Sequence, residues 1–156
     1  INTQHQKDSL DILVFGNDAW TIKLKDIPYL KVGPYHTNTV AGLSLAMDLL
    51  RRRKNSNKQI FMITDGKPSC LKNADGTYYK NSNGLDHLIV DKCYNMAHQA
   101  KRLNIAITTF MIAQDPYLRQ FIQKFSEACE GHAIYTGLDG LGDKIFRGYE
   151  QNTKKR

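Results

Sequence analysis

The chain has 156 residues, of which 41% are hydrophobic and 24% charged, and its formal net charge is +7. These values are typical of one soluble globular domain with a sizeable core. They exclude a membrane-spanning protein, because no apolar run approaches the roughly 18 residues that a transmembrane helix needs. The N-terminus also lacks the charge and apolar pattern of a signal peptide.

Two short runs, 51–54 and 154–156, consist entirely of basic residues. The first run ends an expected helix, where cations compensate the helix dipole, and the second is a terminal tail. This distribution favours solvated charges over a nucleic-acid surface. Cys70, Cys93 and Cys129 are widely spaced and form no CxxC pair. They indicate buried, reduced thiols and a cytoplasmic location.

The first third of the chain predicts a hairpin, a loop and a helix. Residues 8–15 and 20–24 are rich in β-forming residues and flank a short turn, which is typical of an antiparallel hairpin. Residues 26–36 contain two prolines and a glycine, and we expect a loop there. From 39 to 53, apolar residues recur at spacings of three and four, which predicts an amphipathic helix.

The remaining chain alternates between buried strands and helices. Residues 59–64 and 104–113 are continuous apolar runs, as in strands covered on both faces. The polar segment 65–84 between them predicts a long loop with a small hairpin around Asp75-Gly76. We expect further helices over 86–102, after Asp115-Pro116 and near the C-terminus, and a short strand over 132–136.

The predicted order is β-β-α-β-α-β-α-β-α. It indicates a Rossmann-like, three-layer α/β/α fold with a mostly parallel sheet and one antiparallel edge strand. Ligands of such folds lie beyond the carboxyl ends of the strands. Thr37 precedes the first helix and Asp65 ends the next strand, so both are expected at that edge. A hydroxyl and a carboxylate suit Mg²⁺, although a helix cap and an Asp-Gly turn also account for them.

Longer stretches of the chain resemble a known family. "HTNTVAGLSLA" followed by "KQIFMITDGKP" is similar to the second and third motifs of a von Willebrand factor type A (vWA) domain. "GTYYKNSNGLDHLIV", "RLNIAITTFMIAQDPYLRQFI" and "GHAIYTGLDGLG" extend the resemblance over almost the whole chain. The most similar branch is the bacterial one found beside AAA+ ATPases of the MoxR and magnesium-chelatase type.

This resemblance implies a metal-ion-dependent adhesion site (MIDAS). Thr37 and Asp65 would bind Mg²⁺, and an Asp or Glu carboxylate of a protein partner would complete the coordination. Gly66 would let the backbone turn away from the site. The resemblance and the position of the 66–84 loop place further residues on the surrounding rim, as partner-binding candidates: Thr39, Gly66, Lys67, Ser69, Tyr78 and Tyr79. For the two tyrosines, packing of the loop onto the domain is an equally good interpretation.

The chain departs from the family in one respect. The first motif, Asp-x-Ser-x-Ser, is absent, so residues 1–150 resemble a partial vWA domain without its first central strand and helix, followed by a basic tail at 151–156. Three of the usual metal ligands are missing with it, and we expect weak or no Mg²⁺ binding by this chain. We also expect unpaired strand edges and the missing segment upstream in the intact gene product.

The resulting prediction is a non-enzymatic, Mg²⁺-dependent interaction module that serves an AAA+ ATPase or its substrate. One alternative is an RNA-associated vWA domain that binds through its basic surface. A metal-dependent hydrolase ranks lower, because the sequence has no phosphate-binding glycine loop and no GxSxG elbow. His87 with Asp91, and Cys129 with His132, lack the third group that a metal site or a catalytic triad needs.

Overall fold

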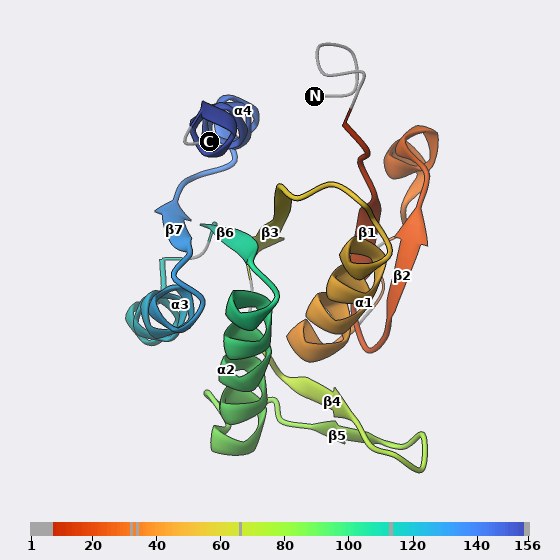
Figure 1. Ribbon diagram of the computed structural model, residues 1–156. Helices are drawn as coiled ribbons and strands as arrows, with labels where there is room; N and C mark the ends of the chain where they lie inside the picture. Colours follow the sequence, from red (N-terminus) through yellow and green to blue (C-terminus); the bar gives the residue numbers. More distant parts are fainter. Residues whose placement is uncertain (1–7, 32, 34, 66, 113, 155–156) are drawn as a thin grey trace.

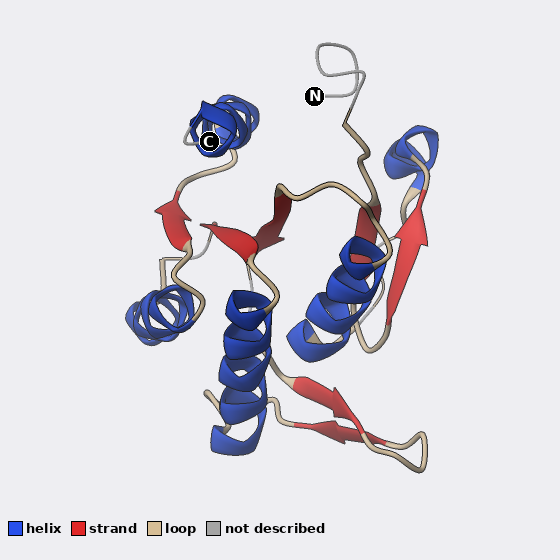
Figure 2. Cartoon of the chain, viewed as in Figure 1, coloured by secondary structure: helices blue, strands red, loops and turns tan. Residues whose placement is uncertain are grey.

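A computed structural model describes residues 8–31, 33, 35–65, 67–112 and 114–154 (Figure 1). Helices and strands alternate along most of the chain (Figure 2). The elements are β1 (Ile12–Phe15), β2 (Ala19–Ile22), the 3-10 helix η1 (Leu24–Tyr29), α1 (Thr39–Arg51), β3 (Lys58–Thr64), β4 (Cys70–Lys72), β5 (Tyr78–Lys80), α2 (His87–Arg102), β6 (Ile105–Met111), α3 (Pro116–Ala128), β7 (His132–Tyr135) and α4 (Leu141–Lys154).

The main sheet is parallel, with the strand order β3-β6-β7. Its register pairs Lys58 with Ile105 and Thr108 with His132. β1 and β2 form a separate antiparallel pair, in which Ile12 faces Ile22. Within the described residues no strand pairs with both β1 and β3. The β1–β2 pair and the main sheet are therefore not hydrogen-bonded to each other as one continuous sheet. The predicted fold class, a mixed α/β fold with a parallel central sheet and covering helices, is confirmed. The antiparallel strands expected at the edge of that sheet form a sheet of their own.

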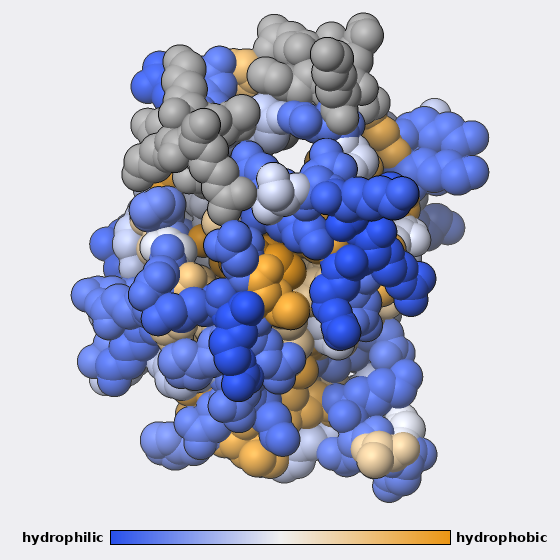
Figure 3. Space-filling model, in the orientation of Figure 1, coloured by the Kyte–Doolittle hydropathy of each residue, from blue (hydrophilic) through white to orange (hydrophobic). Residues whose placement is uncertain are grey.

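Helices cover both faces of this strand layer. α1, α2 and α3 lie on one face and α4 lies on the other (Figure 1). The core is built between the main sheet and the first three helices, where Ile89, Cys93 and Phe125 are fully buried. In Figure 3 hydrophilic side chains cover most of one face, and a hydrophobic band runs down its middle. None of the helices described combines the length and hydrophobicity needed to cross a lipid bilayer.

Local sequence signals account for most element boundaries. Asn38, Asp86 and Asp115 cap α1, α2 and α3 by accepting hydrogen bonds from backbone N–H groups inside each helix. The predicted hairpin around Asp75-Gly76 is confirmed as β4–β5, with Gly76 at φ 85°. The expected loop at 26–36 needs correction, because η1 occupies its first part. η1 buries none of its residues, so hydrophobic periodicity gives no signal for it.

The three cysteines are buried and unpaired, as the sequence indicated. Burial raises the pKa of the Cys93 thiol to about 12, so this thiol is protonated near neutral pH. We therefore expect Ellman's reagent to leave Cys93 unmodified in the folded protein and to label it after unfolding in guanidinium. Mass spectrometry of the labelled cysteine peptide checks this result. Rapid labelling of Cys93 in the native state would contradict the packing of α2 against the sheet.

Candidate metal and partner-binding rim

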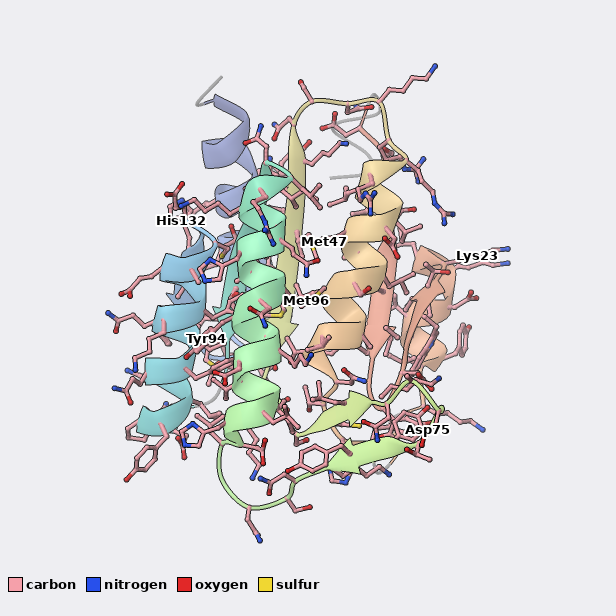
Figure 4. All side chains as sticks on the ribbon, turned by 60° about the horizontal axis from the view of Figure 1, so that its bottom comes forward. Lys23, Met47, Asp75, Tyr94, Met96 and His132 are labelled. Carbon is pink, nitrogen blue, oxygen red and sulfur yellow. The ribbon has the colours of Figure 1, made fainter. Side chains whose placement is uncertain are left out.

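The candidate site lies where the parallel strands end and the covering helices begin. β3, β6 and β7 run in the same direction, so their carboxyl ends share one edge of the sheet. α2 contacts both α1 and α3, and the chain reaches α2 and α3 after leaving the carboxyl ends of β3 and β6. The β4–β5 hairpin, marked by Asp75 in Figure 4, lies beside the first turns of α1 and α2. We call this edge the rim.

Thr37 is fixed at the rim by a reciprocal pair of hydrogen bonds with Ser69. The Thr37 N–H donates to Ser69 Oγ at 3.1 Å, and the Ser69 N–H donates to the Thr37 carbonyl at 2.9 Å. Asp65 is four residues before Ser69, and four extended residues span at most about 14 Å. Thr37 and Asp65 therefore lie at the same end of the molecule, as the sequence predicted.

Both predicted metal ligands have side-chain oxygens available. Asp65 is exposed and makes no hydrogen bond or ion pair with the described residues. The Thr37 hydroxyl also has no partner within that part of the chain, although its backbone is held in place. Gly66 lies outside the described residues. A hydroxyl and a carboxylate match Mg²⁺ in chemical kind, but two protein oxygens are few for an octahedral ion.

The backbone around Thr37 depends on a buried asparagine that the sequence reasoning missed. Asn38 is only 1% exposed; its side chain accepts from the Ala41 N–H at 3.0 Å and donates to the Asn17 carbonyl at 2.9 Å. Asn17 in turn accepts a bond from the His36 N–H at 2.9 Å. These bonds connect the β1–β2 turn to the start of α1. Thr39, expected at the rim, is the first residue of α1 and is buried.

Lys67 and Ser69 hold the segment after Asp65 against the domain. The Lys67 ammonium donates to the Ser82 carbonyl at 2.5 Å. Ser69 is 7% exposed, and its carbonyl accepts from the Asn81 N–H at 2.9 Å. Both side chains thus stabilise the loop that carries Asp65, and the exposed surface that a partner could contact here is small.

The two tyrosines of the hairpin bind carboxylates of this chain. The Tyr78 hydroxyl donates to Asp18, which also pairs with Lys72 at 2.9 Å, and the Tyr79 hydroxyl donates to Asp86 at 2.9 Å. The hydrogen bond from Tyr78, followed by that from Lys72, lowers the pKa of Asp18. These bonds attach β5 to the β1–β2 turn and to the start of α2. Packing of the loop onto the domain therefore accounts for the hydroxyl groups of both tyrosines. Tyr79 as a whole is still 38% exposed.

The other candidates do not assemble into a second site. Within the described residues no three His, Cys, Asp or Glu side chains come close enough to hold a metal ion. His87 and Asp91 are exposed on α2. Cys129 directly follows α3 and is 4% exposed. Burial raises the pKa of its thiol, which disfavours the thiolate that a nucleophile requires.

A slot separates β1 from β3. It has a volume of about 560 Å³, within the range of about 300–1,000 Å³ typical of ligand pockets. Its walls are mostly apolar and come from both strands, from α1 and from α4; they include Phe15, Thr39, Ala46, Phe61 and Ile145. Because Thr39 starts α1 and Phe15 ends β1, the lining of the slot reaches the rim.

Comparisons with known proteins show which family this chain is similar to. A family model described as "Rv0959-like protein, vWA domain" matches residues 1–150. The uncharacterized proteins Rv0959 of Mycobacterium tuberculosis and Mb0984 of Mycobacterium bovis are each 28% identical over 157 residues. The match covers 94% of this chain but 22% of each relative, so the chain spans about a fifth of their length.

Two solved structures share the fold. The vWA domain of SpRpn10 superposes with a TM-score of 0.57 at 15% identity, covering 87% of this chain and 70% of that one. BatB from Bacteroides thetaiotaomicron gives a TM-score of 0.61 at 13% identity, with 92% and 78% of the two chains covered.

Proposed function

The chain belongs to the family of Rv0959-like vWA domains, and from this premise we propose that it is an Mg²⁺-dependent protein-interaction module. vWA domains are generally protein-interaction modules. In the proposed mode of binding, Thr37 and Asp65 hold the ion at the rim, and a carboxylate of the partner completes its coordination. Recognition of this kind needs no bond to be broken, so we propose a binding role and no catalytic one.

The observation that supports this proposal most directly is the contrast between backbone and side chain at the rim. The Thr37 backbone is fixed by Ser69, and the start of α1 is fixed by Asn38. The Thr37 hydroxyl and the Asp65 carboxylate, in contrast, have no partners in the described part of the chain. A hydroxyl on a fixed backbone and an exposed carboxylate are the kinds of oxygen that can bind an external cation.

We further propose that the slot between β1 and β3 receives a strand from a longer form of this polypeptide. Both facing strand edges are unpaired within the described residues, and the slot walls are mostly apolar. A strand in this slot, parallel to β3, would end at the rim. The Asp-x-Ser-x-Ser motif of the vWA family would then supply the missing oxygen ligands beside Thr37 and Asp65. The length of the mycobacterial relatives leaves ample chain for such a segment.

The proposed partner is an AAA+ ATPase of the MoxR or magnesium-chelatase type, or its substrate. This part rests on the sequence resemblance to the bacterial branch found beside such ATPases. The β4–β5 hairpin beside the rim would contribute to partner choice, with the exposed Tyr79 ring as a contact. A cytoplasmic location stays a prediction from the cysteine pattern.

Substitution of Asp65 tests the metal site. In the longer polypeptide that carries the motif, we expect Asp65→Ala to raise the Kd for Mg²⁺ at least about tenfold, because it removes a charged ligand. In the 156-residue chain we expect binding too weak to saturate, since most of the coordination is left to water. Isothermal titration calorimetry measures both affinities.

Asp91→Ala is the matched control, because Asp91 is an aspartate of α2 whose side chain is exposed to solvent. This variant should bind Mg²⁺ like the unmodified protein. Capture of the ATPase partner should be lost in EDTA and in Asp65→Ala, and retained in Asp91→Ala. Capture that withstands both EDTA and Asp65→Ala would refute the metal-dependent mode of binding.

A further inference from the structure

The end of the domain opposite the rim carries a concentration of positive charge. α1 and α2 run from the rim to this end. The seven consecutive residues 51–57, which begin with the last residue of α1, are all exposed here, and four of them are cationic. Figure 4 shows the connection from α1 to β3 at the opposite end from the hairpin. α2 has 16 residues and is therefore about 24 Å long, which sets the approximate separation of the two ends.

The fold brings a second basic segment to the same place. Lys58 starts β3 and lies directly opposite Ile105 of β6, and Arg102 ends α2 only three residues before Ile105. Adjacent strands are about 4.8 Å apart. The cations after α1 and those ending α2 therefore lie at the same end of the domain although they are far apart in the sequence. We call Arg52, Lys54, Lys58 and Arg102 the basic edge.

These four cations differ from their charged neighbours. Arg51 pairs with Asp48 at 3.9 Å, Arg53 with Asp11 at 2.9 Å, and Lys101 with Glu130 at 2.7 Å. The four residues of the basic edge make no ion pair within the described part of the chain.

The helix dipole does not explain all of the unpaired charge. It accounts for cations in the last turn of a helix, because its effect falls off within one turn. Lys54 lies beyond the end of α1, and Lys58 is the first residue of a strand. Unpaired like charges close together repel one another and destabilise the compact state. A partner of opposite charge would remove this cost.

We propose that the basic edge binds an acidic segment of a partner protein, so that the module can hold one partner at the rim and another at the opposite end. An acidic protein segment fits better than nucleic acid because of where the exposed aromatic residues lie. Single-stranded nucleic acid is bound by exposed aromatic side chains, and the exposed aromatic residues of the described chain lie on other segments: Trp20, Tyr29, Tyr35, Tyr79 and Tyr117.

A charge-reversal variant tests this proposal. The probe is a fluorescein-labelled decaglutamate peptide, and its Kd is measured by fluorescence anisotropy in EDTA, which removes any contribution of a metal at the rim. We expect Arg52→Glu/Lys54→Glu/Arg102→Glu to weaken binding at least about tenfold, since each reversal replaces an attraction with a repulsion. The affinity of the unmodified chain should also fall as salt rises.

The matched control is Lys31→Glu/Lys80→Glu/Lys92→Glu, which has the same net charge and alters exposed lysines outside the basic edge. It should change the Kd by less than about twofold if position matters beyond net charge. Equal weakening by both variants, or no binding of the peptide, would overturn the proposal. Tighter binding of a uridine oligonucleotide than of decaglutamate, lost in the basic-edge variant, would overturn it in favour of a nucleic-acid surface. Because the assay contains EDTA, neither result bears on the metal site.

Discussion

Phe125→Ala is expected to lower the free energy of unfolding by about 3–5 kcal/mol, the range found for large aromatic residues in protein cores. Phe125 is fully buried on α3, and its ring lies 6.1 Å from that of Phe121. α3 contacts β6, β7 and α2, so a cavity at this position should weaken the packing of α3 against all three elements. Chemical denaturation in urea, followed by circular dichroism, measures the change.

Tyr117→Ala is the control on the same helix, because Tyr117 is 76% exposed. Its removal should change the free energy of unfolding by no more than about 0.5 kcal/mol, as for most surface substitutions. A loss of similar size in both variants would show that aromatic residues stabilise α3 by a route other than burial. The helix would then not be held by the core described above.

The sequence predicted the helices and the buried strands well, because these depend on local patterns. The spacing of Val40, Leu43, Met47 and Leu50 places one apolar stripe on α1, and Asp115-Pro116 marks the start of α3. The ends were less accurate: α1 ends at Arg51 and not at residue 53. η1 could not be predicted, since a short exposed helix has no apolar stripe to reveal it.

The candidate site was predictable in part. Thr37 and Asp65 could be found because each stands at a junction between a helix or strand and a loop, and because the motifs resemble those of a family. The roles of Asn17, Asn38 and Asp18 could not, because their partners are distant in the sequence and become neighbours only in the folded chain. The slot could not be predicted in detail either, because it depends on which strands pair in the folded chain.

The two ends of the domain are suited to different kinds of recognition. At the rim, an ion bound by the Thr37 hydroxyl and the Asp65 carboxylate would give a directional contact with one carboxylate of the partner. At the basic edge, flexible and exposed cations would attract several carboxylates with little demand on geometry. If both proposals hold, partner binding at the rim should be abolished by EDTA but tolerate moderate salt. Binding at the basic edge should withstand EDTA but weaken as the salt concentration rises.

Filling the slot with a larger side chain is expected to have different effects in the two forms of the polypeptide. Ala46 lies on α1, lines the slot and is 8% exposed. In the 156-residue chain the slot volume of about 560 Å³ leaves space for a ring, so Ala46→Phe should change stability by less than about 1 kcal/mol. In the longer polypeptide the ring should collide with the proposed strand and cost about 1–3 kcal/mol. It should also weaken Mg²⁺ binding at least about tenfold, because the displaced strand carries the additional ligands.

Ser44→Phe controls for the added ring, because Ser44 is an exposed residue of the same helix. It should leave the stability and the Mg²⁺ affinity of the longer polypeptide unchanged, as measured by urea denaturation and calorimetry. Equal effects of Ala46→Phe on both forms would mean that no strand enters the slot. The unpaired edges of β1 and β3 would then be a property of the native domain, and the metal ligands beyond Thr37 and Asp65 would have to come from the partner.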